Sequence, residues 1–143
     1  MSLSISFHSE DVDFQLENEQ QIIDWIKNTI QQEAKSATEI SYIFCTDEYL
    51  YQMNLEYLNH DTYTDIITFD YTEKSVVSGD IFISIDRVKE NAIKFKTTFK
   101  NELSRVIIHG VLHLLGYKDK TPEQKQVMRS KEDFYLTLQG EIG

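Results

Sequence analysis

The sequence predicts an α+β fold: one small domain over residues 1–143, in which about five helices pack on a single mixed sheet of roughly four strands. Short runs of alternating apolar and polar residues indicate the strands, and longer runs with apolar residues at helical spacing indicate the helices. A length of 143 residues with 41% hydrophobic content is sufficient for one buried core. The sequence has no internal repeat, low-complexity tract or linker that would divide it.

Strand-like and helix-like segments alternate in the first half of the chain. Residues 3–7 and 40–44 alternate apolar and polar side chains, which predicts two strands. Residues 17–34 and 46–58 carry apolar side chains at helical spacing, as amphipathic helices do. On the second of these helices, the inner face is expected to consist of Leu50, Met53 and Tyr57.

The second half of the chain is mainly helical. Residues 66–71 and 81–85 predict two further strands, and the Ser78-Gly79 pair predicts the turn between them. Helices are expected over residues 86–95 and 98–115.

The last helix has clear starting residues. Thr121 can cap it, Pro122 fits its first turn, and Gln124 completes a capping box. Its apolar face is expected to consist of Val127, Met128, Phe134, Tyr135 and Leu138.

The charge of the chain is unevenly distributed. The net charge of −10 argues against a nucleic-acid partner for the chain as a whole. Residues 1–86 carry 3 Lys and Arg against 17 Asp and Glu, whereas residues 87–105 carry 6 against 2. The basic stretch leads into the helix expected over residues 98–115, so a polyanion could be guided there. A solvated helix face with ordinary lysine content explains the same charges equally well.

Two histidines and an aspartate form the most informative motif. His109 and His113 are four positions apart, so on a helix both imidazoles project from one face. Gly116 can take the left-handed conformation that ends a helix and turns the chain back, which would bring Asp119 toward the histidines. Two imidazoles, one carboxylate and an open fourth position are typical of a catalytic site for one Zn²⁺. Buried histidines bonded to backbone carbonyls are the alternative.

Composition favours a cytoplasmic protein without a membrane partner. The single cysteine, Cys45, suits a reducing compartment and is expected to be a small buried residue. Residues 1–15 lack the basic and apolar segments of a signal peptide, and no apolar run is long enough to cross a bilayer.

Several blocks of the sequence resemble the YbeY family. The run from His109 to Tyr117, HGVLHLLGY, is similar to that family's HGxLHLxGYDH pattern. Residues 54–69 resemble its LNxxYR…D…TDVLSF block, and residues 79–84, GDIFIS, resemble its GDIxIS strand. Glu102 and Leu103 precede the histidines as in family members. The blocks run in the family's order from about residue 53 to Asp119.

This resemblance implies a metal-dependent endoribonuclease. The implied substrate is single-stranded rRNA, and the implied setting is 16S rRNA 3′-end maturation and ribosome assembly or quality control. RNA and the small ribosomal subunit would then be the partners. Metal-assisted phosphodiester hydrolysis would take place at His109, His113 and Asp119. The oligomeric state is not implied.

Two positions depart from the family pattern. Asp119 stands where the family usually has histidine; a carboxylate also binds zinc and admits harder ions such as Mn²⁺ or Ni²⁺. Leu58 stands where the family commonly has an arginine, and the resemblance implies that this arginine takes part in RNA cleavage. Arg105, one helical turn before His109, could supply a cation there, although a surface salt bridge is the favoured interpretation.

Two other functions stay open. The spacing of the motif also fits metzincin metalloproteases, but these carry a catalytic glutamate after the first histidine, where this chain has Gly110. Alternatively, the metal stabilises a non-catalytic ribosome-assembly factor, although structural zinc usually has four protein ligands. His8 and His60 are expected at the surface, yet either could reach the site from a loop.

Overall fold

The computed structural model describes residues 3–142, so residues 1, 2 and 143 of the predicted domain lie outside the described residues. Five helices and four strands confirm the predicted α+β class. In chain order the elements are β1 (Ser4–Glu10), α1 (Glu19–Gln32), β2 (Ser36–Cys45), α2 (Asp47–Leu58), β3 (Ile66–Asp70), β4 (Val76–Ser84), α3 (Ile85–Lys94), α4 (Phe99–Leu114) and α5 (Pro122–Ile142).

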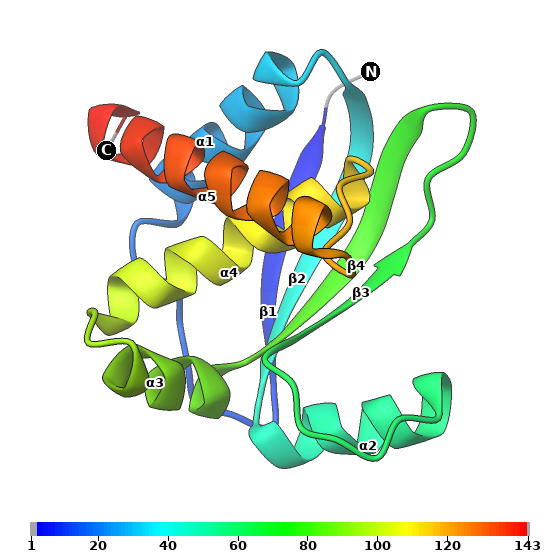
Figure 1. The fold of residues 1–143 in the computed structure, drawn as a ribbon, viewed down its shortest axis with the longest axis vertical. Helices are drawn as coiled ribbons and strands as arrows, with labels where there is room; N and C mark the ends of the chain where they lie inside the picture. Colours follow the sequence, from blue (N-terminus) through cyan, green and yellow to red (C-terminus); the bar gives the residue numbers. More distant parts are fainter. Residues whose placement is uncertain (1–2, 143) are drawn as a thin grey trace.

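One mixed sheet organises the molecule, with strand order β1-β2-β4-β3. Strands β1, β2 and β4 are parallel to one another, and β3 pairs with β4 in the antiparallel direction. Strand β3 is therefore an edge strand of the sheet. Figure 1 shows α1, α3, α4 and α5 on one face of the sheet, with α2 at the lower end beside β3 and β4.

The core lies between the sheet and helix α4. Alternate residues of β2 and β4 face this helix, because successive side chains of a strand point to opposite faces. A smaller cluster of Cys45, Leu50 and Ile67 fills the space under α2. Helix α4 is buried over most of its circumference, as its sequence predicts.

Two glycines let α4 lie directly against the sheet. A Cβ added at Gly110 would lie 2.9 Å from Ile81 Cγ2, and one at Gly79 would lie 2.7 Å from Leu114 Cδ2. A larger residue at either position would push the helix away from the sheet. Because the histidines are on this helix, the close approach also fixes their distance from β3.

The predicted turn at Ser78 and Gly79 is wrong, because both residues lie inside β4. The hairpin turns instead at Lys74 and Ser75, which have φ angles of 51° and 67°. Glu73 and Val76 flank this two-residue turn and exchange backbone hydrogen bonds of 3.2 and 2.8 Å. Two positive φ values are typical of the tight turns that match strand twist.

The ends of α4 and α5 confirm the predicted capping. Gly116 has a φ of 110°, and its N–H donates to the His113 carbonyl at 3.0 Å. Tyr117 N–H reaches back to the Leu112 carbonyl at 3.0 Å, which completes a Schellman motif. At the start of α5, Thr121 and Gln124 exchange side chain–backbone hydrogen bonds of 3.1 Å each, as a capping box does.

Three apolar residues that were expected to pack inward are exposed. Tyr57 on α2 is 62% exposed, and Val127 and Phe134 on α5 are 47% and 50% exposed. Met128 and Tyr135 are buried as predicted, so the inner face of α5 is narrower than its apolar composition indicates. None of the helices within residues 3–142 has the length and hydropathy needed to span a membrane.

Candidate metal centre

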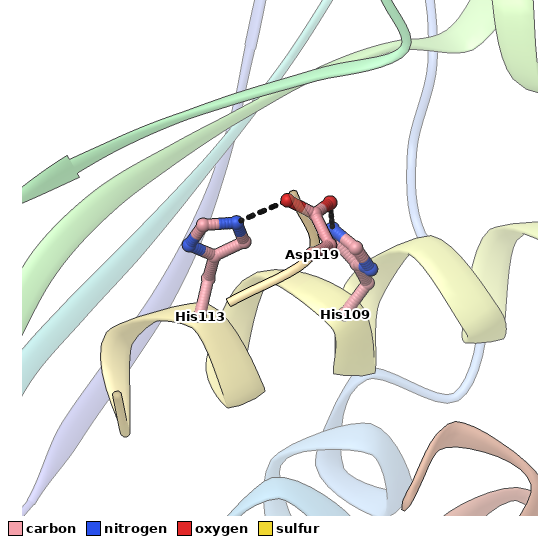
Figure 2. A group of neighbouring side chains, drawn as sticks. All are labelled: His109, His113 and Asp119. Atoms are coloured by element: carbon pink, nitrogen blue, oxygen red, sulfur yellow. Dashed lines mark ion pairs between the residues drawn. The ribbon is translucent and has the colours of Figure 1, made fainter. Parts of the chain in front are cut away.

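The structure brings His109, His113 and Asp119 together. Both histidines project from α4, and the loop after Gly116 places the Asp119 carboxylate between the imidazoles (Figure 2). His109 Nε2 lies 3.3 Å from one carboxylate oxygen, and His113 Nε2 lies 3.5 Å from the other. One donor atom from each residue can be chosen so that all three lie within 4.8 Å of one another.

These separations fit a metal site. Ligands about 2.1 Å from a tetrahedrally bound zinc are roughly 3.4 Å from one another. The two histidine–aspartate distances lie close to that value. The His113 and Asp119 side chains are 34% and 37% exposed, so the donor atoms stay reachable from the solvent. The cluster could therefore hold one metal ion with an open side.

A second carboxylate, from Glu132 on α5, contacts the His109 ring at the nitrogen that does not face Asp119. Glu132 Oε2 accepts a hydrogen bond from His109 Nδ1 at 2.7 Å, so Nε2 is the free nitrogen that faces Asp119. Metal-binding histidines commonly donate their other N–H to a carboxylate, which fixes the ring orientation and the tautomer. The sequence does not point to Glu132, because nothing in its local spacing indicates that α5 meets α4 there.

Burial and the surrounding carboxylates act on the His109 pKa in opposite directions. Burial alone lowers the His109 pKa, but the hydrogen bond and negative charge of Glu132 outweigh it, so the pKa is raised above its ordinary value. Asp119 and Asp65 raise the His109 pKa further through their negative charge. The same negative surroundings stabilise any cation that binds at Nε2.

The cluster lies in a cleft of about 530 Å³. The cleft is bounded by edge strand β3 and the residues before it, the end of α3, the exposed face of α4, and α5. Its walls carry both acidic and basic side chains. The acidic ones include Asp65, Glu102 and Glu132, and the basic ones are Arg105, Lys125 and Arg129. A cleft of this size admits a flexible single strand more readily than a duplex.

Two carboxyl groups of the cleft wall hold their protons more firmly than exposed carboxyls. Burial raises the Asp65 pKa above its ordinary value, although His109 and Arg87 partly offset this effect. Burial also raises the Glu102 pKa, and the nearby negative charge of Asp65 adds to it. Raised pKa values in a cleft are typical of functional sites. Neither residue was assigned a role from the sequence.

Arg105 forms the predicted salt bridge, and its side chain is partly buried. Its guanidinium lies 2.9 Å from Glu132 and 2.8 Å from Asp133, and its side chain is 22% exposed. It thereby neutralises the carboxylate that orients His109. Two carboxylates already engage its nitrogens, so Arg105 acts mainly within the protein.

The other singled-out residues lie elsewhere. His8 pairs with Ser6 on β1, and His60 is an exposed residue after α2, so neither belongs to the described metal cluster. Leu58 is 41% exposed at the end of α2 and does not line the cleft. Cys45 is fully buried, and burial raises its thiol pKa to about 12.

Position 110 has no room for a metalloprotease glutamate. A Cβ at Gly110 would already crowd Ile81 and Ile66, whose Cδ1 atom would lie 3.1 Å away. A longer side chain at this position would point into the helix–sheet contact. The structure therefore adds a steric argument to the chemical one against peptide hydrolysis.

A small α+β domain with a cleft-exposed histidine–carboxylate cluster defines the class of this protein: a single-domain protein with a candidate mononuclear metal site. Residues 4–140 match the family described as Endoribonuclease YbeY, and the chain belongs to that family.

Comparisons with individual proteins agree with this assignment. An "Endoribonuclease YbeY" from Flavobacterium johnsoniae is 54% identical over 134 residues, which are 94% of this chain and 96% of that protein. One from Cytophaga hutchinsonii is 54% identical over 136 residues, covering 94% and 95% of the two chains. The solution structure of a Thermotoga maritima protein matches with a TM-score of 0.66 at 26% identity, over 93% of this chain and 87% of that one.

Proposed function

We propose that the chain is a metal-dependent endoribonuclease, and that residues 1–143 form a single metallohydrolase domain of this kind. One ion, zinc or alternatively Mn²⁺ or Ni²⁺, would be held by His109, His113 and Asp119. The substrate would be single-stranded rRNA in 16S 3′-end maturation and ribosome assembly or quality control. The setting would be the cytoplasm, with the small ribosomal subunit as partner.

One observation carries this proposal: in a chain that belongs to a family described as endoribonucleases, the one metal-type cluster found within residues 3–142 opens into a cleft of about 530 Å³. An active site needs both a reactive group and a hollow that binds substrate next to it. A purely structural ion needs neither an open side nor a cleft.

The chain's own residues supply the rest of the mechanism. A bound ion would provide a Lewis acid that stabilises negative charge on a phosphodiester. Glu132 holds the ring of His109 so that Nε2 faces the cleft. Arg105 balances the charge of Glu132, and Lys125 places a cationic side chain at the cleft wall, where a phosphate backbone would pass.

The test combines metal analysis with a cleavage assay. Protein purified without a metal-binding tag should contain about one equivalent of metal by mass spectrometry. It should cleave a defined single-stranded fragment of the rRNA 3′ region, and a chelator should abolish the cleavage. A folded protein that stays metal-free in added zinc would overturn the proposal.

The same preparation separates the alternatives. A metalloprotease would cleave an unstructured protein substrate, whereas we expect no such activity because position 110 has no general base. A non-catalytic assembly factor would bind one equivalent of metal and bind RNA without cutting it. Cleavage of RNA that depends on the metal excludes that second alternative.

A further inference from the structure

A second hollow opens beside the metal cleft, on the side of the α3–α4 connection. It has a volume of about 280 Å³ and is lined by Phe95, Thr97, Asn101, Glu102, Arg105 and Arg129. Four of these residues also line the metal cleft, so the two hollows share a wall. A volume near the lower end of ligand pockets suits one nucleotide rather than a larger group.

The two arginines of this shared wall, Arg105 and Arg129, differ in how closely they pair with carboxylates. Arg105 makes close ion pairs with Glu132 and Asp133, at 2.9 and 2.8 Å. Among the described residues, the one ion pair of Arg129 is a long contact of 3.8 Å with Glu132, and the Arg129 side chain is 62% exposed. The guanidinium of Arg129 therefore keeps donors for an outside anion. A phosphate oxygen is the anion that guanidinium donors match in nucleic acids.

The same wall presents an exposed aromatic ring. Phe95 follows α3 and is 57% exposed, and its ring has the Lys94 ammonium 5.7 Å from its centre. An aromatic ring left half in solvent beside a cation is typical of surfaces that stack unpaired bases and contact the adjacent phosphates. Phe95 is thus accessible on the same side as Arg129.

We propose that this second hollow is a nucleotide subsite next to the cleaved phosphodiester. The base of that nucleotide stacks on Phe95, and its phosphate binds Arg129, while the neighbouring phosphate lies at the metal cluster. This inference rests on the proposed function and adds the part of the substrate that the chain recognises. The inference also assigns to Arg129 the role of a cation beside the metal cluster. Leu58, which stands at the arginine position of the family, does not line the cleft.

Single-turnover cleavage over a range of protein concentrations tests the stacking contact. The substrate is a short single-stranded RNA whose cleavage position has been mapped, and each base flanking that position is removed in turn. In the wild type, loss of one flanking base should raise the half-saturating protein concentration roughly ten-fold. In Phe95→Leu the intact RNA should bind about as weakly as the abasic RNA, and removing the base should have little further effect.

Matched variants separate stacking from folding. Phe95→Trp should keep the wild-type response to the abasic RNA. Phe134→Leu is a control, because Phe134 is an equally exposed ring that lines neither hollow. If removing the base raises the half-saturating protein concentration by the same factor in the wild type and in Phe95→Leu, the stacking role is wrong.

The salt dependence of binding tests the phosphate contact. Arg129→Gln should weaken binding and lower the slope of log K against log salt by about 0.7, as expected when one contact to a single strand is lost. Lys27→Gln, which removes an exposed positive charge on α1, should leave the slope unchanged. Metal content should stay at the wild-type level in both variants. An unchanged slope in Arg129→Gln overturns its assignment.

The outcomes also distinguish the subsite from the proposed function. If the metal-loaded wild type cleaves no RNA, the proposed function fails, and anisotropy with the same labelled RNAs then decides whether the subsite exists. If the wild type cleaves RNA but the Phe95 and Arg129 variants match it in every respect, the subsite alone fails. Tighter binding of an acidic peptide than of RNA would also overturn the subsite.

Discussion

Two carboxylates contact opposite nitrogens of His109, and they differ in burial, in the type of element that carries them and in their partners. Asp119 lies on a loop with its side chain 37% exposed, 3.3 Å from Nε2. Glu132 lies within α5 with its side chain 7% exposed, 2.7 Å from Nδ1, and it has Arg105 as a counter-ion. The exposed carboxylate of Asp119 therefore suits a candidate metal ligand, whereas the buried carboxylate of Glu132 suits a fixed support for the histidine.

Glu33, a carboxylate outside the metal cluster, holds the loop of Asp119 in place. Glu33, just after α1, accepts hydrogen bonds from the hydroxyls of Tyr117 and Tyr135 and from the Lys131 ammonium at 3.0 Å. Its carboxylate thus joins α1, the loop and α5. The candidate ligand Asp119 is therefore positioned by a largely buried carboxylate that does not itself belong to the metal cluster.

The largest expected effect comes from removing Asp119, the exposed candidate ligand. Asp119→Ala should lose most of the bound metal, because two imidazoles alone leave the ion undercoordinated. RNA cleavage should fall to background. Metal content is measured by mass spectrometry on untagged protein. Asp119→His is the matched control and should retain about one equivalent; a fully loaded Asp119→Ala would contradict the ligand assignment.

Removing the charge of the buried support should have a smaller effect. Glu132→Gln keeps the shape of the side chain but no longer stabilises the bound cation through His109. We expect metal affinity to fall about 10- to 100-fold, as measured by competition with a chromophoric chelator. Asp133→Asn is the control, because it removes the other partner of Arg105 without touching His109. Equal losses in the two variants would show that Arg105, rather than Glu132, is responsible.

The smallest effect is expected at Glu33, and it concerns stability. Glu33→Gln should lower the free energy of unfolding at pH 7 by about 1–3 kcal/mol, because the hydrogen bonds lose a charged acceptor. Urea unfolding measures the difference. Gln20→Ala, which removes an exposed contact elsewhere on α1, should change stability much less.

The pH dependence of that difference has a defined sign. Burial raises the Glu33 pKa, but the hydrogen bonds of Tyr117, Tyr135 and Lys131 outweigh it, so the folded-state pKa lies below the ordinary value of 4.5. The stabilisation is then fully present above pH 4.5 and is lost as the pH falls through the folded-state value. Wild type and Glu33→Gln should converge in stability on acidification. A constant difference down to acidic pH would show that the charge of Glu33 is not responsible.

Local patterns in the sequence were sufficient for the element types and the three candidate ligands. Helical periodicity places His109 and His113 on one face, and Gly116 reverses the chain after a fixed number of residues. These relations depend on short-range backbone geometry, which the sequence specifies directly. For that reason Asp119 could be predicted although it lies on a loop.

Other features were decided only by the way distant segments pack. Glu132 reaches His109 because α5 crosses α4, and Gly79 is a strand residue because its backbone pairs with Ile40 of β2 and Asp70 of β3. Phe95 and Arg129 share a wall although they belong to separate helical regions of the chain. Such contacts join residues far apart in sequence, and they follow from helix directions and close packing, which local spacing does not encode.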